Sequence, residues 1–474
     1  MKTSWRATSR ILLLGLWLSS YLVSPYSLHG QASLVSWTES AETDMLSLYA
    51  CEAFKSTGDT DPLSFFVDSY ALWLELVVKD QWSQLDDYKT SLKSARAELS
   101  HDDTAQSQYL LADLLLHDAV IDLLRDRRWS GLRKLHRVYD ALIDLEIDNP
   151  QALDVQKSLG VIEWLVSQMT PSQQRWVKRL TSLDGDREVA ISRLVRATEQ
   201  ADVMGMEASI ALCLIYAAED PIMAEEALDG LPIQGGLIAL IRAGVDLQHG
   251  RPADAITLLD RYTMDLSKWY FLHGKADLYT ENYDSAHEHF IRSTQLNQGP
   301  HLEAQVALYQ YWLQLLTTAD PPERPDLSGD YVIDADLAAL DELRSADPHP
   351  QILRGRLAQD AGRYDQSITI LTQIDTSLLT SEYTEEHAYR LARAYQKAGD
   401  TAQALLHLTA FVDDYHTSRE YYRSAALIAL AELYMTMDDQ EHARLCAEEC
   451  LDSKPNRHAQ SLHREARELL EEME

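Results

Sequence analysis

The strongest constraint on the fold is a pattern of small and apolar residues that occurs three times between Pro350 and Pro455. Each copy centres on a short break between two helical segments, at Gly362, Gly399 and Asp438, and these breaks lie 37 and 39 residues apart. Small residues lie seven positions before each break (Gly355, Ala392 and Ala431) and five positions after it (Ser367, Ala404 and Ala443). Small or apolar residues lie nine positions after it (Leu371, Leu408 and Ala447) and twelve positions after it (Ile374, Phe411 and Cys450). Three consecutive copies of one helix pair predict a helical solenoid.

This pattern resembles the tetratricopeptide repeat, in which small residues lie where two antiparallel helices come closest. Gly185, Gly250 and the Glu281-Asn282 break are followed by small and apolar residues at similar offsets, with Gly185 in the role of Gly399. The resemblance implies an all-α fold, a right-handed superhelical solenoid of antiparallel helix pairs. The periodicity indicates about six recognisable repeats and roughly twenty or more helices.

The first residues have the composition of a secretory signal peptide. Three basic residues precede an apolar run from Ile11 to Val23, which is shorter than the about twenty residues of a membrane-spanning helix. Gly30 and Ala32 are small residues suited to cleavage before Ser33. The sequence therefore predicts an exported protein, in the periplasm or associated with the envelope, with an uncleaved anchor as the alternative. Since no Cys closely follows the run, a lipoprotein anchor is not expected.

A second set of residues resembles the tetratricopeptide-repeat-39 and Iml-type mitochondrial family. It comprises Gly160-Val161, Met169-Thr170-Pro171, Gly185-Asp186 and Leu194. The order of the later repeats and the long loop before the final ones are also similar. Members of that family are intracellular, whereas this chain begins with an export signal, so the resemblance implies architecture and no function.

Breaks in the helical pattern divide the chain into five segments. A Pro-rich stretch with Pro321, Pro322 and Pro325 predicts a semi-rigid loop between helices. The predicted segments are a signal peptide (1–32), an N-terminal helical region (33–149), helical repeats (150–317), the Pro-rich loop (318–333) and C-terminal repeats with a charged capping helix (334–474). In the N-terminal region the periodicity predicts helices over 82–99, 103–125 and 129–147.

The composition restricts the partners. Residues 1–32 contain three basic and no acidic residues, so their removal changes the formal net charge from −33 to −36. Such a surface repels phosphates and anionic lipid headgroups, so we expect neither nucleic acid nor an anionic membrane as a general partner. A protein or peptide ligand is the expected partner, and the charge also keeps a long solenoid soluble.

No catalytic motif is present. The sequence lacks a phosphate-binding Gly-x-x-x-x-Gly-Lys-Ser/Thr loop, a Gly-x-Ser-x-Gly elbow and a His-Glu-x-x-His pair. His287-Glu288-His289 places two imidazoles about 200° apart on a helix, so they cannot share one metal ion and are expected on the surface. We expect no enzyme activity, no cofactor and no metal.

His442, Cys446 and Cys450 fall on one face of a helix, where a metal site would need a fourth ligand from elsewhere. Cys450 occupies the packing position that Phe411 and Ile374 fill in the other copies, so packing is the favoured interpretation. A metal site or a disulfide remains the alternative.

The candidate binding residues follow from the tetratricopeptide resemblance, which places the first helix of each pair on the concave surface. The position after each small residue holds Lys275, Arg356, Arg393 and Glu432, three of them basic, and other groove-facing positions hold Phe271, Tyr389 and Ile352. Arginines flanked by aromatic rings could hold a carboxylate of an extended peptide. The alternative is that these cations pair with nearby Asp and Glu side chains.

The favoured function is an exported scaffold for protein–protein interactions. The first alternative is an exported nutrient- or glycan-binding protein, and a lower-ranked one is an all-helical glycan-active enzyme, because 10 tryptophans and 23 tyrosines could form a carbohydrate surface. However, five tryptophans lie within apolar helical patterns and are expected in the core: Trp73, Trp164, Trp176, Trp269 and Trp312. The sequence leaves the oligomeric state open.

Overall fold

The structure of this protein is a computed structural model. It describes residues 82–125, 127–169, 185–200, 204–217, 221–229, 236–262, 264–296, 300–318, 348–416, 421–455 and 459–473, with isolated residues from 66 to 76 and between these ranges. The predicted signal peptide and nearly all of the predicted Pro-rich loop lie outside the described residues.

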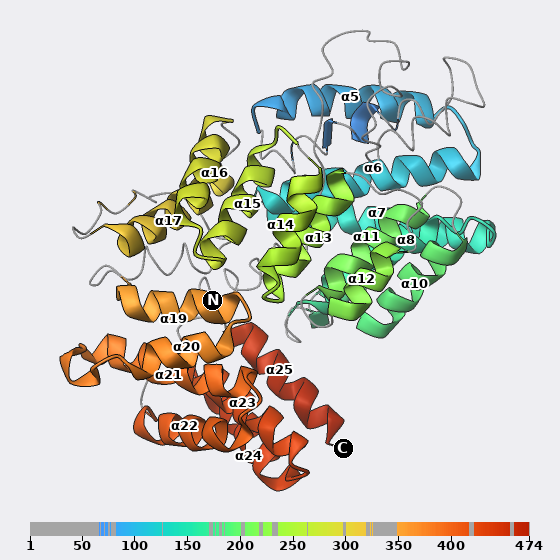
Figure 1. Cartoon of the computed structure of the whole chain (residues 1–474). Helices are drawn as coiled ribbons and strands as arrows, with labels where there is room; N and C mark the ends of the chain where they lie inside the picture. Colours follow the sequence, from blue (N-terminus) through green and yellow to red (C-terminus); the bar gives the residue numbers. More distant parts are fainter. Residues whose placement is uncertain are drawn as a thin grey trace.

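The described residues form an all-α solenoid (Figure 1). Its elements are η1 (Trp82–Gln84), α5 (Leu85–Leu99), α6 (Ala105–Leu124), α7 (Arg128–Asp148), α8 (Val155–Ser167), α10 (Arg187–Gln200), α11 (Gly205–Tyr216), α12 (Pro221–Asp229), α13 (Gly236–Gln248), α14 (Pro252–Arg261), α15 (Ser267–Tyr279), α16 (Tyr283–Gln295), α17 (Pro300–Thr317), α19 (Pro350–Asp360), α20 (Tyr364–Thr372), η2 (Thr376–Leu378), α21 (Ser381–Lys397), α22 (Thr401–Asp414), α23 (Tyr421–Thr436), α24 (Gln440–Asp452) and α25 (Ala459–Glu472). The predicted fold class of antiparallel helix pairs is confirmed.

The helix pairs form two layers from α13 onward. The first helices α13, α15, α19, α21 and α23 pack against one another, with α17 in contact with both α15 and α19. Each second helix packs on its own first helix and on the helix that follows it. Burial reflects this difference, because α15 is buried along nearly its whole length whereas α16 buries only Ala286, Phe290 and Ser293. Polar side chains on the inner layer therefore need partners within the protein.

Five turns between paired helices have the same backbone conformation. Gly250, Glu281, Gly362, Gly399 and Asp438 all have φ between 60° and 78°, the left-handed region that ends a helix in the Schellman motif. In each turn the next residue donates its backbone N–H to the carbonyl five residues earlier: Arg251 to Asp246, Asn282 to Asp277, Arg363 to Ala358, Asp400 to Tyr395 and Asp439 to Tyr434. The predicted breaks are confirmed at all five positions.

The small residues lie at the closest approach of the paired helices, as predicted. A Cβ atom at Gly274 would lie 2.7 Å from the ring of Phe290, and one at Gly355 would lie 2.6 Å from the side chain of Leu371. In both pairs the large residue follows the small one by sixteen positions. The second helix therefore inserts one side chain against the backbone of the first.

Gly185 does not play the role predicted for it. Its φ is outside the left-handed region, and a Cβ atom there would lie 2.4 Å from the backbone nitrogen of Ser167 at the end of α8. Helix α10 packs directly on α8, where a Cβ at Gly160 would lie 2.9 Å from the carbonyl oxygen of Ala190. Glycine is needed at 185 because two backbone segments touch there.

The N-terminal helices agree with the periodicity. Predicted helices over 82–99, 103–125 and 129–147 correspond to η1 with α5, to α6 and to α7. The next helix, α8, begins only at Val155, because the preceding residues form turns in which Ala152 donates its N–H to the carbonyl of Asn149 at 2.9 Å.

Helix α25 does more than cover the last repeat with charged residues. It packs on both α23 and α24, and Arg464 donates a hydrogen bond to Gln168 at the end of α8. In Figure 1, α25 lies beside α23 and α24. The C-terminal helix thus joins two segments that lie far apart in sequence. In the described part of the chain, no helix combines the length and apolar character needed to span a bilayer.

The turn geometry makes different predictions for two glycines. Gly399→Ala should cost about 1 kcal/mol of folding free energy, because a Cβ there meets no atom within 4 Å and only the backbone conformation is disfavoured. Gly362→Ala should cost about 3 kcal/mol, because its Cβ would also lie 2.6 Å from the carbonyl oxygen of Gly250. Thermal unfolding followed by circular dichroism measures both. Equal losses for the two variants would contradict the close contact between these turns.

Candidate functional site

Two of the predicted cations lie against the same helix of the inner layer. The Lys275 Nζ atom on α15 is 5.4 Å from the centre of the Tyr309 ring, and the Arg356 guanidinium on α19 is 4.8 Å from that of Trp312. The rings of Tyr309 and Trp312 on α17 are themselves 4.9 Å apart. The structure therefore brings Lys275 and Arg356 together across two adjoining aromatic rings, in a geometry that favours cation–π attraction.

Arg390 on α21 extends this arrangement. The positive charge of Arg356 acts on Arg390, and the Nε atom of Arg390 is 3.5 Å from the Glu386 carboxylate. Burial alone would lower the pKa of Arg390, but the oxygens of Tyr421 and Glu386 outweigh it and keep this guanidinium charged. We call Lys275, Tyr309, Trp312, Arg356 and Arg390 the cation–aromatic strip. It crosses α15, α17, α19 and α21.

Arg393, the third predicted cation, lies in a different environment. It donates a hydrogen bond to Gln396, and its charge acts on Glu465 of α25 together with that of Glu432. Burial raises the pKa of Glu465, with Arg464 and Arg393 opposing the shift. The surroundings of Arg393 are therefore shared with the C-terminal helix, and the strip includes Arg390 in its place.

The three predicted apolar contacts are buried, which corrects their expected place on an open groove. Phe271, Ile352 and Tyr389 have 3%, 1% and 6% of their surface exposed. Phe271 packs edge-on against Tyr309 at 5.4 Å, and Tyr389 packs against Tyr422 at 4.9 Å. Because the first helices contact one another directly, residues at these positions fill the inner layer.

A buried ion cluster lies in the N-terminal half. The Lys157 Nζ atom on α8 is 2.7 Å from Asp113 Oδ1 on α6 and 2.6 Å from Glu207 Oε2 on α11. Ser158 donates a hydrogen bond of 2.6 Å to Asp113, and His117 Nε2 lies 3.6 Å from its other oxygen. Burial alone would raise the pKa of Asp113, but the charges of Lys157 and His117 outweigh it and the pKa lies below its ordinary value. We call this the Lys157 cluster. The Lys157 ammonium group lies between the two carboxylates, where a bound metal ion would otherwise be expected.

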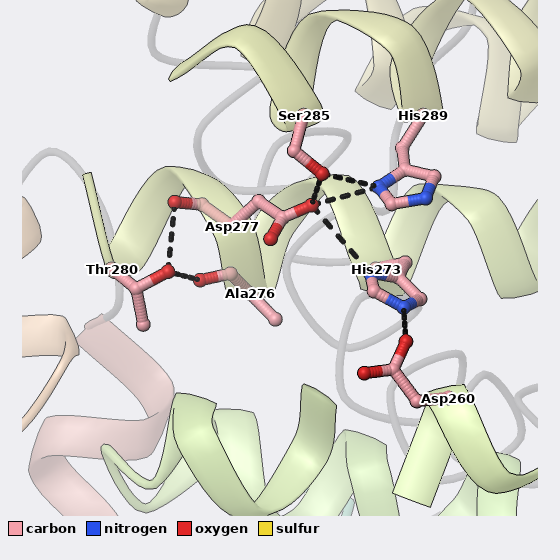
Figure 2. Close-up of polar contacts among 7 residues, drawn as sticks. All are labelled: Asp260, His273, Ala276, Asp277, Thr280, Ser285 and His289. Atoms are coloured by element: carbon pink, nitrogen blue, oxygen red, sulfur yellow. Dashed lines mark hydrogen bonds and ion pairs between the residues drawn. The ribbon is translucent and has the colours of Figure 1, made fainter. Parts of the chain in front are cut away.

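A second polar cluster joins the two helices of one repeat, as Figure 2 shows. His289 Nδ1 on α16 lies 2.7 Å from Asp277 Oδ2 on α15, and His273 Nδ1, one helical turn earlier, lies 3.5 Å from the same oxygen. The two imidazole rings have centres 4.0 Å apart. Ser285 donates a 2.7 Å hydrogen bond to Asp277 Oδ2, and Asp260 of α14 lies 3.0 Å from His273 Nε2. We call His273, Asp277 and His289 the His–Asp–His cluster.

The pKa shifts in this cluster follow from its contacts. Burial alone would raise the pKa of Asp277, but the neighbouring His273 imidazole and hydrogen bonds from His289 and Ser285 outweigh it and lower the pKa well below its ordinary value. Burial alone would lower the pKa of His273, but its two carboxylate neighbours raise it. The cluster therefore holds a stable carboxylate between two imidazoles.

His287 and the cysteines behave as structural residues. His287 is exposed, as predicted, and lies outside the His–Asp–His cluster, because it projects about 200° away from His289 on the same helix. His289, which was also expected on the surface, is partly buried. Cys450 is buried and Cys446 partly buried, both as free thiols, and burial raises their pKa values to about 12 and about 11. His442 is exposed and bonded to Asp439 at 2.8 Å. Packing accounts for the two cysteines.

Four residues of these sites were not predicted from the sequence: Arg390, Lys157, His273 and Asp277. Arg390 lies three positions before Arg393, and the repeat alignment selected only the latter. Lys157 is a cation within an apolar helical pattern. The one usable sequence signal was the spacing of His273 and Asp277, four residues apart and so on one helical face.

The Lys157 cluster generates a stability prediction. Lys157→Met should cost about 3–5 kcal/mol at pH 7, because it leaves two carboxylates without their buried cation. The matched variant Arg292→Met should cost far less, because its ion pair with Asp265 is exposed to solvent. Chemical denaturation of each variant measures the loss.

The deficit of Lys157→Met should shrink on acidification. In the native protein the lowered pKa of Asp113 stabilises the fold at pH values above the pKa of the unfolded carboxyl group, about 3.9. This contribution is lost as the pH falls through the pKa of Asp113 in the folded protein. Without Lys157 the buried carboxyl group takes up a proton at higher pH. The difference between variant and native protein should therefore be larger at pH 7 than at pH 5, and a difference that does not change with pH would contradict the buried ion pair.

Comparisons with known proteins give one family match. Residues 424–457, which contain most of α23 and all of α24, match the family described as "Tetratricopeptide repeat". No curated protein matches the sequence. The second resemblance, to the tetratricopeptide-repeat-39 and Iml-type family, stays a prediction.

Two solved structures are similar at low superposition scores. The crystal structure of the P58(IPK) TPR domain has 16% identity and a TM-score of 0.21, and the match covers 86% of this chain and 98% of that one. The crystal structure of the APC/C hetero-tetramer Cut9-Hcn1 has 12% identity and a TM-score of 0.22, covering 93% and 98%. The assignment of repeats rests on residues 424–457 and on the turns and helix contacts described above.

Proposed function

We propose that this chain, a tetratricopeptide-repeat protein, is a scaffold that binds a protein partner through the cation–aromatic strip. The observation that carries the proposal is the gathering of Lys275 and Arg356 over the rings of α17, with Arg390 of the next inner-layer helix within electrostatic reach of Arg356. Positive groups gathered in this way are unusual on a chain with formal net charge −33. The proposal involves no catalytic step.

The chemistry of the strip favours an acidic segment of polypeptide. Two guanidinium groups that lie close together repel each other, and a carboxylate between them relieves that repulsion while accepting paired hydrogen bonds. Lys275 adds a third cation on another helix, α15. An extended segment with several acidic groups therefore matches the strip better than one small anion. The partner's carboxylates would also avoid the acidic remainder of the surface.

Arg393 extends the proposal toward the C-terminal helix. Glu465 lies within electrostatic reach of Arg393, so a partner that contacts Arg393 competes with a carboxylate of the chain itself. We therefore expect Arg393 to contribute less to partner binding than the cation–aromatic strip.

We propose that the scaffold is exported and acts in the periplasm or at the envelope. The support is the basic start, the short apolar run from Ile11 to Val23 and the small residues before Ser33. The glycan-binding alternative has less support, because Trp73, Trp269 and Trp312 are buried and offer no free ring face for stacking on a sugar.

The proposal predicts charge-selective peptide binding. In fluorescence anisotropy, a peptide rich in Asp and Glu should bind the protein, whereas its Asn and Gln counterpart of equal length should not. The double variant Lys275→Gln with Arg356→Gln should weaken the acidic peptide about tenfold or more, because it removes two of the three cations. Raising the salt concentration should weaken binding as well.

Arg292→Gln is the matched control, because Arg292 is an exposed cation on the outer helix α16 that lies over the ring of Tyr270 on α15. It should change the affinity less than about twofold. Equal binding of both peptides, or an equal loss in the double variant and the control, would rule out the strip as the binding site. Circular dichroism of each variant verifies that the helices are intact.

A further inference from the structure

The His–Asp–His cluster brings together three side chains of the types that bind metal ions. His273 and Asp277 lie one turn apart on α15, and His289 faces them from α16 (Figure 2). One possible ligand atom from each residue lies within 4.8 Å of the other two. All three belong to a single helix pair, so the tight packing of α15 on α16 fixes their positions.

The tautomer of His273 is set by its outer partner. A carboxylate can only accept a hydrogen bond, so the 3.0 Å contact with Asp260 requires that His273 Nε2 carry the proton. In the neutral ring the Nδ1 atom then carries a lone pair. This buried atom has no hydrogen-bond partner, and it lies 3.5 Å from Asp277 Oδ2. A lone pair thus faces a carboxylate oxygen, an arrangement that a cation between them would stabilise.

The distances suit a small divalent ion. Tetrahedral Zn²⁺ with bonds of about 2.0–2.1 Å holds its ligand atoms about 3.4 Å apart. The separation of 3.5 Å between His273 Nδ1 and Asp277 Oδ2 matches that value. His289 Nδ1 is closer to the carboxylate, at 2.7 Å, because it donates a hydrogen bond there. A small rotation of His289, whose side chain is 24% exposed, would open the third position.

The surrounding groups resemble the outer shell of a metal site. A histidine that binds a metal through one nitrogen usually donates the other N–H to a carboxylate, and Asp260 accepts such a bond from His273. Ser285 donates a hydrogen bond to Asp277 Oδ2 and so fixes the orientation of this carboxylate. The partial exposure of His289 gives an ion access to the cluster from solvent.

The Lys157 cluster provides a comparison within the same protein. Asp113, His117 and Glu207 also place ligand atoms within 4.8 Å of one another. There the Lys157 ammonium contacts both carboxylates at 2.6 and 2.7 Å, so the chain itself supplies the cation. At Asp277 the contacting groups are imidazoles and a hydroxyl group, which can yield to a metal ion without displacing a fixed charge.

We propose that His273, Asp277 and His289 bind one divalent transition-metal ion of the Zn²⁺ class through His273 Nδ1, Asp277 Oδ2 and His289 Nδ1. Two imidazoles and one carboxylate suit Zn²⁺, Cu²⁺ or Ni²⁺, whereas Mg²⁺ and Ca²⁺ prefer oxygen ligands alone. On binding, His289 loses its proton from Nδ1 and holds one at Nε2, on the exposed side of the ring. The ion would then link α15 to α16.

The direct test is isothermal titration calorimetry of the whole chain, stripped of metal, with Zn²⁺ as the probe. We expect one saturable site per chain, and Co²⁺ at the same site should give the visible absorption bands of a four-coordinate ion. His273→Gln and His289→Gln should each weaken Zn²⁺ binding by about tenfold or more, and Asp260→Asn, a positioning residue, by about 10–100-fold. Zn²⁺ should also raise the Tm of the native protein.

His287→Gln is the matched control, because His287 lies two residues from His289 on the same helix but is exposed and outside the cluster. It should leave both the affinity for Zn²⁺ and the Co²⁺ bands unchanged. If His273→Gln does not fold, the partly exposed His289 still provides the test. The absence of a saturable site, or equal losses in His287→Gln and His289→Gln, would overturn the proposal.

Discussion

The structure depends on one contact, the close approach of two antiparallel helices at a single small residue in each repeat. At Gly274 and Gly355 the second helix places a Phe290 or Leu371 side chain directly against the backbone of the first. A larger residue there would separate the helices and remove the inner layer that successive first helices form. Because this layer is buried from both sides, its polar residues must find partners inside the protein, as those of the cation–aromatic strip and the His–Asp–His cluster do.

The turns could be predicted from sequence because their chemistry is local. A chain reversal between paired helices needs one residue with positive φ, and the spacing of small and apolar residues located it at Gly250, Gly362 and Gly399. The same spacing located Asp438, where no glycine marks the turn. Gly185 was assigned the wrong role because its requirement comes from contact with the end of α8, which spacing along the chain does not reveal.

The candidate site was only partly predictable. The repeat alignment found Lys275 and Arg356, because equivalent positions in a solenoid face the same way. It selected Arg393 and missed Arg390, because the turn of α21 and the position of α25 decide which arginine joins the strip. Phe271, Ile352 and Tyr389 were expected on a groove, but their burial depends on how tightly the first helices contact one another. Single-helix patterns contain no information on that distance.

The two buried aspartates show how the same requirement can be met in different ways. Asp113 and Asp277 each lie on a packed helix beside a histidine four residues away, and each keeps its carboxylate ionised in a buried place. For Asp113 the compensating charge is Lys157, which belongs to the chain and cannot leave, so this cluster can only contribute to the fold. For Asp277 the compensation comes from hydrogen bonds and from imidazoles that carry a full charge only when protonated. A carboxylate stabilised in that way retains affinity for an external cation, and its position between α15 and α16 would make the stability of that repeat depend on what it binds.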